Sequence, residues 1–149
     1  MNYSAATCWL WIGCVLGVSF ISTPAKFLAP DLDLADALAV GRATFWVMQW
    51  VELALLGLLV GSFLLESRAN LATHFMLFTT TLLLSINCFM VRPMLDVRVE
   101  SIIQGQHLPP SLLHNVYIGI EVLKIFVLGV FGRALYLQEA QHDVTFTDE

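Results

Sequence analysis

Two glutamates and a lysine lie inside apolar stretches of the sequence that are long enough to cross a bilayer. Glu121 and Lys124 stand three residues apart in the run HNVYIGIEVLKIF, and Glu52 lies in another apolar run. A charged side chain near the bilayer centre costs roughly 2.5–3.5 kcal/mol on the insertion scale. Three such groups facing lipid would oppose insertion. We therefore expect them to pair with one another, and Glu52 with Lys124 is the simplest ion pair.

Other polar residues share helix faces with these three. Spacings of three, four or seven residues place two sets of side chains each on one face of a helix. The sets are His114, Tyr117, Glu121 and Lys124, and Arg42, Gln49 and Glu52. The pattern predicts a buried polar layer of Glu52, Glu121, Lys124, Gln49 and Tyr117, with Arg42, Arg92 and His114 on the cytoplasmic side.

Three interpretations of this layer remain open. Polar residues inside a helix bundle can simply fix register and pairing, at under about 2 kcal/mol each. They can form a proton relay or transport site, since Glu121 must either be protonated or bind His114, Tyr117 or Arg92 if Glu52 takes Lys124. They can also bind a ligand or cofactor.

Signatures of catalysis and cofactor binding are missing from the sequence. It contains no nucleophile–base pair, phosphate-binding glycine loop or carboxylate metal cage. His74 and His114 start different apolar segments on opposite sides, so they cannot ligate one haem, and no HxxxH or Cys/His cluster suits zinc or copper. We expect no enzymatic activity, no catalytic residue, no metal and no cofactor.

Composition indicates an integral membrane protein. The 149 residues are 58% hydrophobic and 13% charged, about half the charged fraction of a soluble domain, and the net charge is −5 with no basic patch. Nucleic acid is therefore not an expected partner. Four apolar segments near the length of a spanning helix predict an all-α, single-domain four-helix bundle over 1–149, with spans at about 5–22, 43–65, 71–91 and 112–137.

The connections carry helix signals of their own. Asp33 is a candidate N-cap for a surface helix or an extension of span two, and Ser111 for span four. Thr23-Pro24 and Arg92-Pro93 are expected to end spans one and three. Apolar residues from Leu95 to Ile103 at helical spacing predict a short interfacial helix between spans three and four. Four basic residues on one side against two on the other place both termini outside.

The layout resembles the small four-span membrane proteins of unknown function grouped with the eukaryotic transmembrane protein 205. The matching features are WIGCVLGVSF, Ala29-Pro30, Gly41-Arg42-xx-Phe45, Arg92-Pro93 with Asp96 and Glu100, and a final span led by His114. The resemblance implies a four-helix membrane bundle and supplies no catalytic residues. A more distant likeness to copper-resistance membrane proteins lacks their first-helix histidines, because Cys8 and Val15 stand there instead.

The sequence thus favours a non-enzymatic small membrane protein, surrounded by lipids, in a bacterial inner membrane. The first functional hypothesis is an accessory or assembly subunit of a larger membrane complex. The alternative is a small proton-coupled transporter or exporter that works as a homo-oligomer and uses the buried Glu/Lys layer. A third possibility is a lipid, pigment or metal binder.

Overall fold

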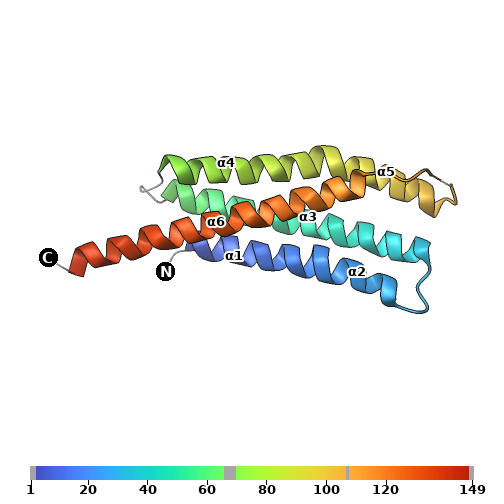
Figure 1. Cartoon of the computed structure of the whole chain (residues 1–149), viewed down its shortest axis with the longest axis horizontal. Coiled ribbons are helices and arrows are strands. Elements are labelled where there is room, and N and C mark those ends of the chain that lie inside the picture. Colours follow the sequence, from blue (N-terminus) through green and yellow to red (C-terminus); the bar gives the residue numbers. More distant parts are fainter. Residues whose placement is uncertain (1–2, 66–69, 107, 148–149) are drawn as a thin grey trace.

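A computed structural model describes residues 3–65, 70–106 and 108–147, and these residues are helical almost throughout, with no β-strand among them. The all-α prediction is therefore confirmed for this part of the chain. Four helical segments lie side by side along the long axis (Figure 1). The elements are α1 (Tyr3–Val15), the π-helix η1 (Leu16–Ser22), α2 (Thr23–Ala25), the 3-10 helix η2 (Lys26–Leu28), α3 (Leu34–Leu65), α4 (Leu71–Ile86), the π-helix η3 (Asn87–Val91), α5 (Arg92–Ile103) and α6 (Leu113–Thr147).

Helix α6 occupies the central position in this arrangement. It packs against α1 on one side and α4 on the other, while α3 packs against α1 and α5. Both chain termini lie at one end of the molecule, and α2 and α5 lie at the other (Figure 1). We call these the termini end and the loop end.

Two prolines do not end the helices in which they occur. We expected Pro24 to end span one and Pro93 to end span three, but the first segment continues to Leu28 and the third to Ile103. Each proline follows a π-helical turn, in which the amide of Thr23 donates to Val18 and that of Arg92 to Asn87. The wider π turn gives the proline ring room where an α-helical carbonyl would clash.

The prediction of a separate interfacial helix between spans three and four is wrong, because the third segment does not end at Pro93. Helix α5 follows η3 directly and continues the third segment, so it does not form an element of its own lying across the end. It ends at Ile103, two residues before Gly105, whose φ of 82° is a left-handed conformation that favours glycine.

Helix starts follow the predicted caps. The amide of Asp36 donates to Oδ1 of Asp33 at 2.7 Å, so α3 begins at Leu34 and the surface stretch is an extension of the second segment. The amide of Leu113 donates to the Ser111 hydroxyl at 3.2 Å at the start of α6.

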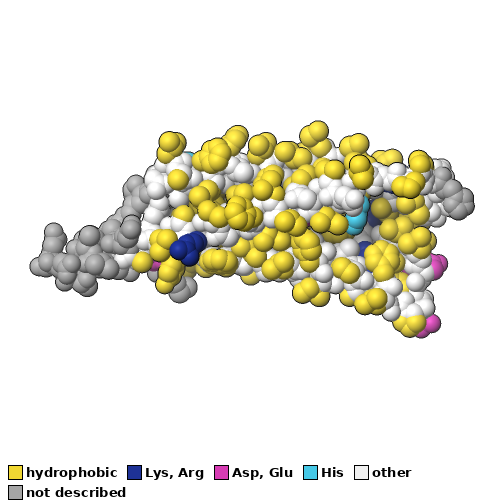
Figure 2. Space-filling model, in the orientation of Figure 1, with side chains coloured by type: hydrophobic (Ala, Val, Ile, Leu, Met, Phe, Trp, Pro, Cys, Tyr) yellow, Lys and Arg dark blue, Asp and Glu magenta, His cyan; other side chains and the backbone are white. Residues whose placement is uncertain are grey.

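The packed core and the apolar exterior are arranged as a membrane protein requires. Most core side chains lie toward the termini end, where Phe63 contacts Phe131 edge to face at 5.6 Å. Apolar side chains also cover much of the outside (Figure 2), with Phe89 and Phe126 exposed. Three helical segments are long and apolar enough to cross a bilayer, namely Tyr3–Leu28, Leu34–Leu64 and Leu71–Ile103.

Small residues contribute to this packing at one place. A Cβ added to Gly132 of α6 would lie 3.1 Å from Cβ of Cys8 and 3.3 Å from Nε1 of Trp9, so α1 and α6 approach closely there. The glycines of the two GxxxG spacings, Gly13, Gly17, Gly57 and Gly61, meet nothing within 4 Å of such a Cβ among the described residues.

We expect Gly132→Val to lower the free energy of unfolding by about 1–3 kcal/mol, because the side chain overpacks the α1–α6 contact. Gly119→Val is the matched control on the same helix, since nothing lies within 4 Å of a Cβ there. Denaturant titration in detergent, followed by circular dichroism, measures both. Equal losses in the two variants would contradict the close approach.

Candidate functional site

Lys124 lies at the centre of a buried charge cluster. Its Nζ donates to Oε1 of Glu52, and it donates to Oε1 of Glu121 at 2.9 Å. The three side chains are at most 1% exposed, so the ammonium group is shared by two carboxylates away from water. We call Glu52, Glu121, Lys124 and the neighbouring Arg92 the charge cluster.

The other helical segments also contribute to the charge cluster. From α1, Nε1 of Trp11 donates to Oε1 of Glu52 at 3.0 Å, and from η3, Nδ2 of Asn87 donates to Oε1 of Glu121 at 2.6 Å. From α5, Nη2 of Arg92 lies 3.6 Å from Oε2 of Glu52. All four helical segments therefore meet at this level.

Arg92 is itself held by helix α3. Its Nη1 donates to the carbonyl of Phe45 at 2.7 Å and to Oε1 of Gln49 at 3.1 Å. These two bonds fix the guanidinium beside the carboxylates. With every group ionised, two negative and two positive charges cancel, which a low-dielectric site requires.

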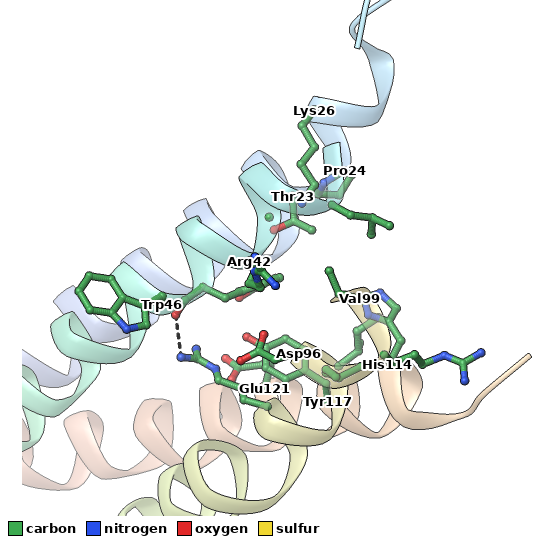
Figure 3. A pocket seen from close by; sticks show the side chains of 18 of the residues that line it. Thr23, Pro24, Lys26, Arg42, Trp46, Asp96, Val99, His114, Tyr117 and Glu121 are labelled. Carbon is green, nitrogen blue, oxygen red and sulfur yellow. Dashed lines mark hydrogen bonds between the residues drawn. The ribbon is translucent and has the colours of Figure 1, made fainter. Parts of the chain in front are cut away.

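A cavity of about 590 Å³ opens from the loop end and reaches the charge cluster. That volume lies in the range of small-molecule sites. Figure 3 shows Thr23, Pro24 and Lys26 on one side of it, and Asp96, Tyr117 and Glu121 on the other. The cavity lies beside both π-helical turns, which precede Pro24 and Pro93, and π turns frequently accompany functional sites.

The inner end of the cavity carries polar atoms without partners. Nε and Nη2 of Arg92, the Tyr117 hydroxyl and the Ser19 hydroxyl are buried and form no hydrogen bond with a described residue. Arg92 is 6% exposed and Tyr117 is 3% exposed. All three side chains line the cavity. Unpaired buried donors cost free energy, so the inner end of the cavity, which we call its floor, suits a group that accepts hydrogen bonds.

The mouth of the cavity is rich in cations. Lys26 lies over the rings of Phe27 and Phe45, at 5.1 and 5.9 Å, and forms no ion pair with a described residue. Arg42 pairs with Glu100, and an Nη of Arg98 donates to the carbonyl of Pro109. His114 and Asp96 complete the polar lining.

The structure brings together the five residues of the predicted polar layer, with one difference from the expected contacts. Glu52, Glu121 and Lys124 form the cluster, Gln49 holds Arg92, and Tyr117 lines the cavity. Glu121 is bound by Asn87 and Lys124, whereas we expected it to be protonated or to bind His114, Tyr117 or Arg92.

Arg92 is the residue that the sequence misplaced. We expected it at the cytoplasmic side with Arg42 and His114, but it is buried in the charge cluster, because the third segment continues through Arg92-Pro93 instead of ending there. Sequence reasoning also did not include Trp11 in the polar layer. The signal in the sequence is the spacing of Trp11 from Cys8 and Val15, which places all three on one face of the helix, and this face is buried.

Metal-ligating side chains do not gather in the described part of the chain. No group of three or more histidine, cysteine, aspartate or glutamate side chains there could hold a metal ion. The cluster carboxylates already accept bonds from Lys124, Trp11 and Asn87. Two carboxylates, an ammonium group and a guanidinium group beside a cavity can bind charged groups and exchange protons.

We expect Lys124→Met to lower the free energy of unfolding by about 3–5 kcal/mol, because it leaves a buried carboxylate unpaired. Adding Glu121→Gln restores the balance between Glu52 and Arg92, so the double variant should recover part of that loss. Denaturant titration in detergent measures both. A double variant as unstable as Lys124→Met would show that the charges do not act as one balanced unit.

Comparison with known proteins places the chain in a family. No curated protein and no solved structure matches it. A family model matches residues 7–97, a range that runs from α1 into α5 and includes Trp11, Glu52 and Arg92 but not α6. The match covers more than half of the 149 residues, and the chain therefore belongs to the family defined by this domain of unknown function (DUF4149).

Proposed function

We propose that the chain is a four-span membrane protein that binds a small ligand in its cavity and couples the passage of that ligand to a proton on Glu121. One observation carries this proposal: Glu121 belongs both to the charge cluster and to the cavity wall. A ligand in the cavity and the buried charges can therefore influence each other directly.

The fourth span of the proposal is α6. It packs between α1 and α4, and its Val122, Phe126 and Val130 are exposed as lipid-facing side chains would be. Its charged residues Glu121 and Lys124 point the other way and are buried. A helix with this division has one face for lipid and one for the interior.

A purely structural role for the polar layer explains less of the geometry. Residues that only fix register satisfy one another and leave no space beside them. Here Arg92 and Tyr117 keep unpartnered polar atoms, and both line a cavity wide enough for a ligand. Such an arrangement costs stability and is typical of a binding site.

For the membrane, we propose a bacterial inner membrane with the loop end in the cytoplasm. Lys26, Arg42 and Arg98 lie at this end, in agreement with the positive-inside rule, whereas Arg92 is buried in the charge cluster and does not count toward it. The cavity then opens toward the cytoplasm, and both termini lie outside. An exporter would load its ligand from that side.

The other functional hypotheses have less support from the geometry. The accessory-subunit hypothesis remains a prediction, since it rests on small residues and a compact chain, and the glycines of the two GxxxG spacings leave a face open to another chain. The resemblance to the transmembrane protein 205 group is compatible with the DUF4149 match and names no activity. Lipid binding would use the same cavity.

Coupling predicts that access to the cavity depends on pH. We expect Val99→Cys, whose position lines the cavity on α5, to react with a charged maleimide at a rate whose pH dependence differs severalfold from that of an exposed cysteine, because protonation of Glu121 changes the charge of the cavity wall. In the Glu121→Gln background the rate should show only the intrinsic pH dependence of the thiol, because the glutamine cannot titrate. Labelling of the chain in membrane vesicles, read by mass spectrometry, gives the rates.

The matched controls separate access from reagent chemistry. Val97→Cys lies on α5 as well, is 71% exposed, and should show only the intrinsic pH dependence of the thiol. Glu139→Gln lies on α6 and should leave the Val99→Cys profile unchanged. If Val99→Cys follows Val97→Cys at every pH, with or without Glu121→Gln, the coupling proposal is wrong.

A further inference from the structure

We infer that the ligand of the cavity is an amphipathic anion, with one negatively charged head group on the cavity floor and an apolar chain along its wall. This inference rests on the proposed function, because it names the class of molecule that the cavity binds. It covers both a free acid and a single-chain phospholipid, since a carboxylate and a phosphate offer the same acceptor oxygens.

The head group is specified by buried donors that make no hydrogen bond within the described part of the chain, although Nη2 of Arg92 lies 3.6 Å from Oε2 of Glu52. Nε and Nη2 of Arg92 lie on one edge of the guanidinium, and neither forms a hydrogen bond with a described residue. That edge matches the two oxygens of a carboxylate or phosphate. The Tyr117 hydroxyl and the Ser19 hydroxyl, also unpartnered and on the cavity lining, supply further donors.

The same observations favour an anionic over a cationic head group at this floor. Arg92 has no acceptor to offer, because a guanidinium only donates. The cluster carboxylates are engaged by Lys124, and additionally by Trp11 on Glu52 and Asn87 on Glu121. Two buried acceptor atoms, Oε2 of Glu52 and Oδ1 of Asn87, also lack a hydrogen bond to any described residue, but neither residue lines the cavity. Arg92, Tyr117 and Ser19 do line it, so the cavity itself presents donors, as an anion site does.

The chain is specified by the wall of the cavity. Apolar side chains from four elements line it, among them Phe20, Leu38, Phe45, Leu95, Ile102 and Ile118. Figure 2 shows Lys or Arg atoms and a histidine recessed among apolar side chains near the loop end. A molecule with an apolar chain could therefore enter from lipid without leaving an apolar environment.

Charges at the mouth favour the same sign of ligand. Lys26 lines the cavity without an ion pair to a described residue, and Arg42 and Arg98 lie beside it. Arg42 is balanced by Glu100, and Asp96 is the acidic side chain of the mouth. The remaining excess of positive charge attracts an anion toward the floor.

Charge balance explains why binding of the anion would be coupled to protonation of Glu121. The charge cluster is neutral when all four groups are ionised, so an anion beside Arg92 leaves one uncompensated negative charge in a low-dielectric site. A proton on Glu121 removes it. The groups that face Glu121 are Glu52 from α3, Asn87 and Cys88 from η3, Arg92 and Asp96 from α5, and His114, Tyr117 and Lys124 from α6. Anion and proton should therefore bind together.

Binding of matched amphiphiles to the purified protein in a non-ionic detergent tests the inference. The probes are laurate, lauroyl lysophosphatidate, dodecanol and dodecylamine, which share one chain length and differ in head group. Quenching or shift of tryptophan fluorescence reports binding, because Trp46 lines the cavity. We expect at least one anion to bind about tenfold or more tightly than both dodecanol and dodecylamine, as for a hydrogen bond to a charged group.

Variants at the cavity floor test whether its side chains cause the preference for an anionic head group. Arg92→Gln should weaken the anion about tenfold or more and leave dodecanol unchanged, whereas the exposed Arg133→Gln should change neither. Tyr117→Phe removes a single hydroxyl from the cavity lining and keeps the ring, and it should weaken the anion severalfold. Glu121→Gln mimics the protonated carboxyl group and should bind the anion more tightly.

The outcomes separate the possible sources of the ligand. Preference for laurate indicates a free acid, and preference for lysophosphatidate indicates a phospholipid. Equal binding of all four probes, binding of none, or an anion affinity unchanged by Tyr117→Phe would overturn the inference. The pH-dependent labelling of Val99→Cys uses no ligand, so it can succeed when this test fails.

Discussion

The shared ammonium group of Lys124 is the interaction on which the rest of the structure depends. Two carboxylates in an apolar interior repel each other and lose their hydration, so neither can stay ionised there without a cation between them. Glu52 and Glu121 come from different helices, and Lys124 joins them. Trp11 and Asn87 then bring the remaining segments to the same level. The depth and rotation of all four helical segments are thereby fixed relative to one another.

The charge cluster also divides the molecule into two unlike halves. Toward the termini end, apolar side chains such as Leu59 and Phe131 pack closely and are fully buried. Toward the loop end, π turns before Pro24 and Pro93 alter the course of two helices, and a cavity lies beside them. A chain selected only for stability would pack both halves alike. The open half, with its unpartnered donors, is where a ligand can act on the charges.

Much of this arrangement could be predicted from the sequence, and the exceptions have physical reasons. Burial of Glu52, Glu121 and Lys124 followed from the cost of charge in lipid, and their shared level followed from helical rise. Arg92 was misplaced because proline usually ends a helix. No residue pattern in the sequence indicates that a π turn precedes Pro93. Trp11 was missed because an indole suits an interface as well as a buried hydrogen bond.

The cavity could not be predicted in the same way. It depends on how far two bent helices diverge, which is a property of their packing and not of any residue pattern. Its lining combines residues that the sequence grouped elsewhere, such as Lys26 from the end of the first segment and Asp96 from the expected interfacial helix. Polar spacing reveals which face of a helix is buried, but not whether the space beside that face is filled.

Native mass spectrometry of the protein extracted from its own membrane in mild detergent tests the central claim most directly. The account predicts a chain that retains a small molecule of defined mass, and that loses it when Arg92 is replaced by glutamine. A chain recovered without any bound small molecule, as one component of a stable complex with other proteins, would contradict it. The charge cluster would then serve only to hold the helices in register.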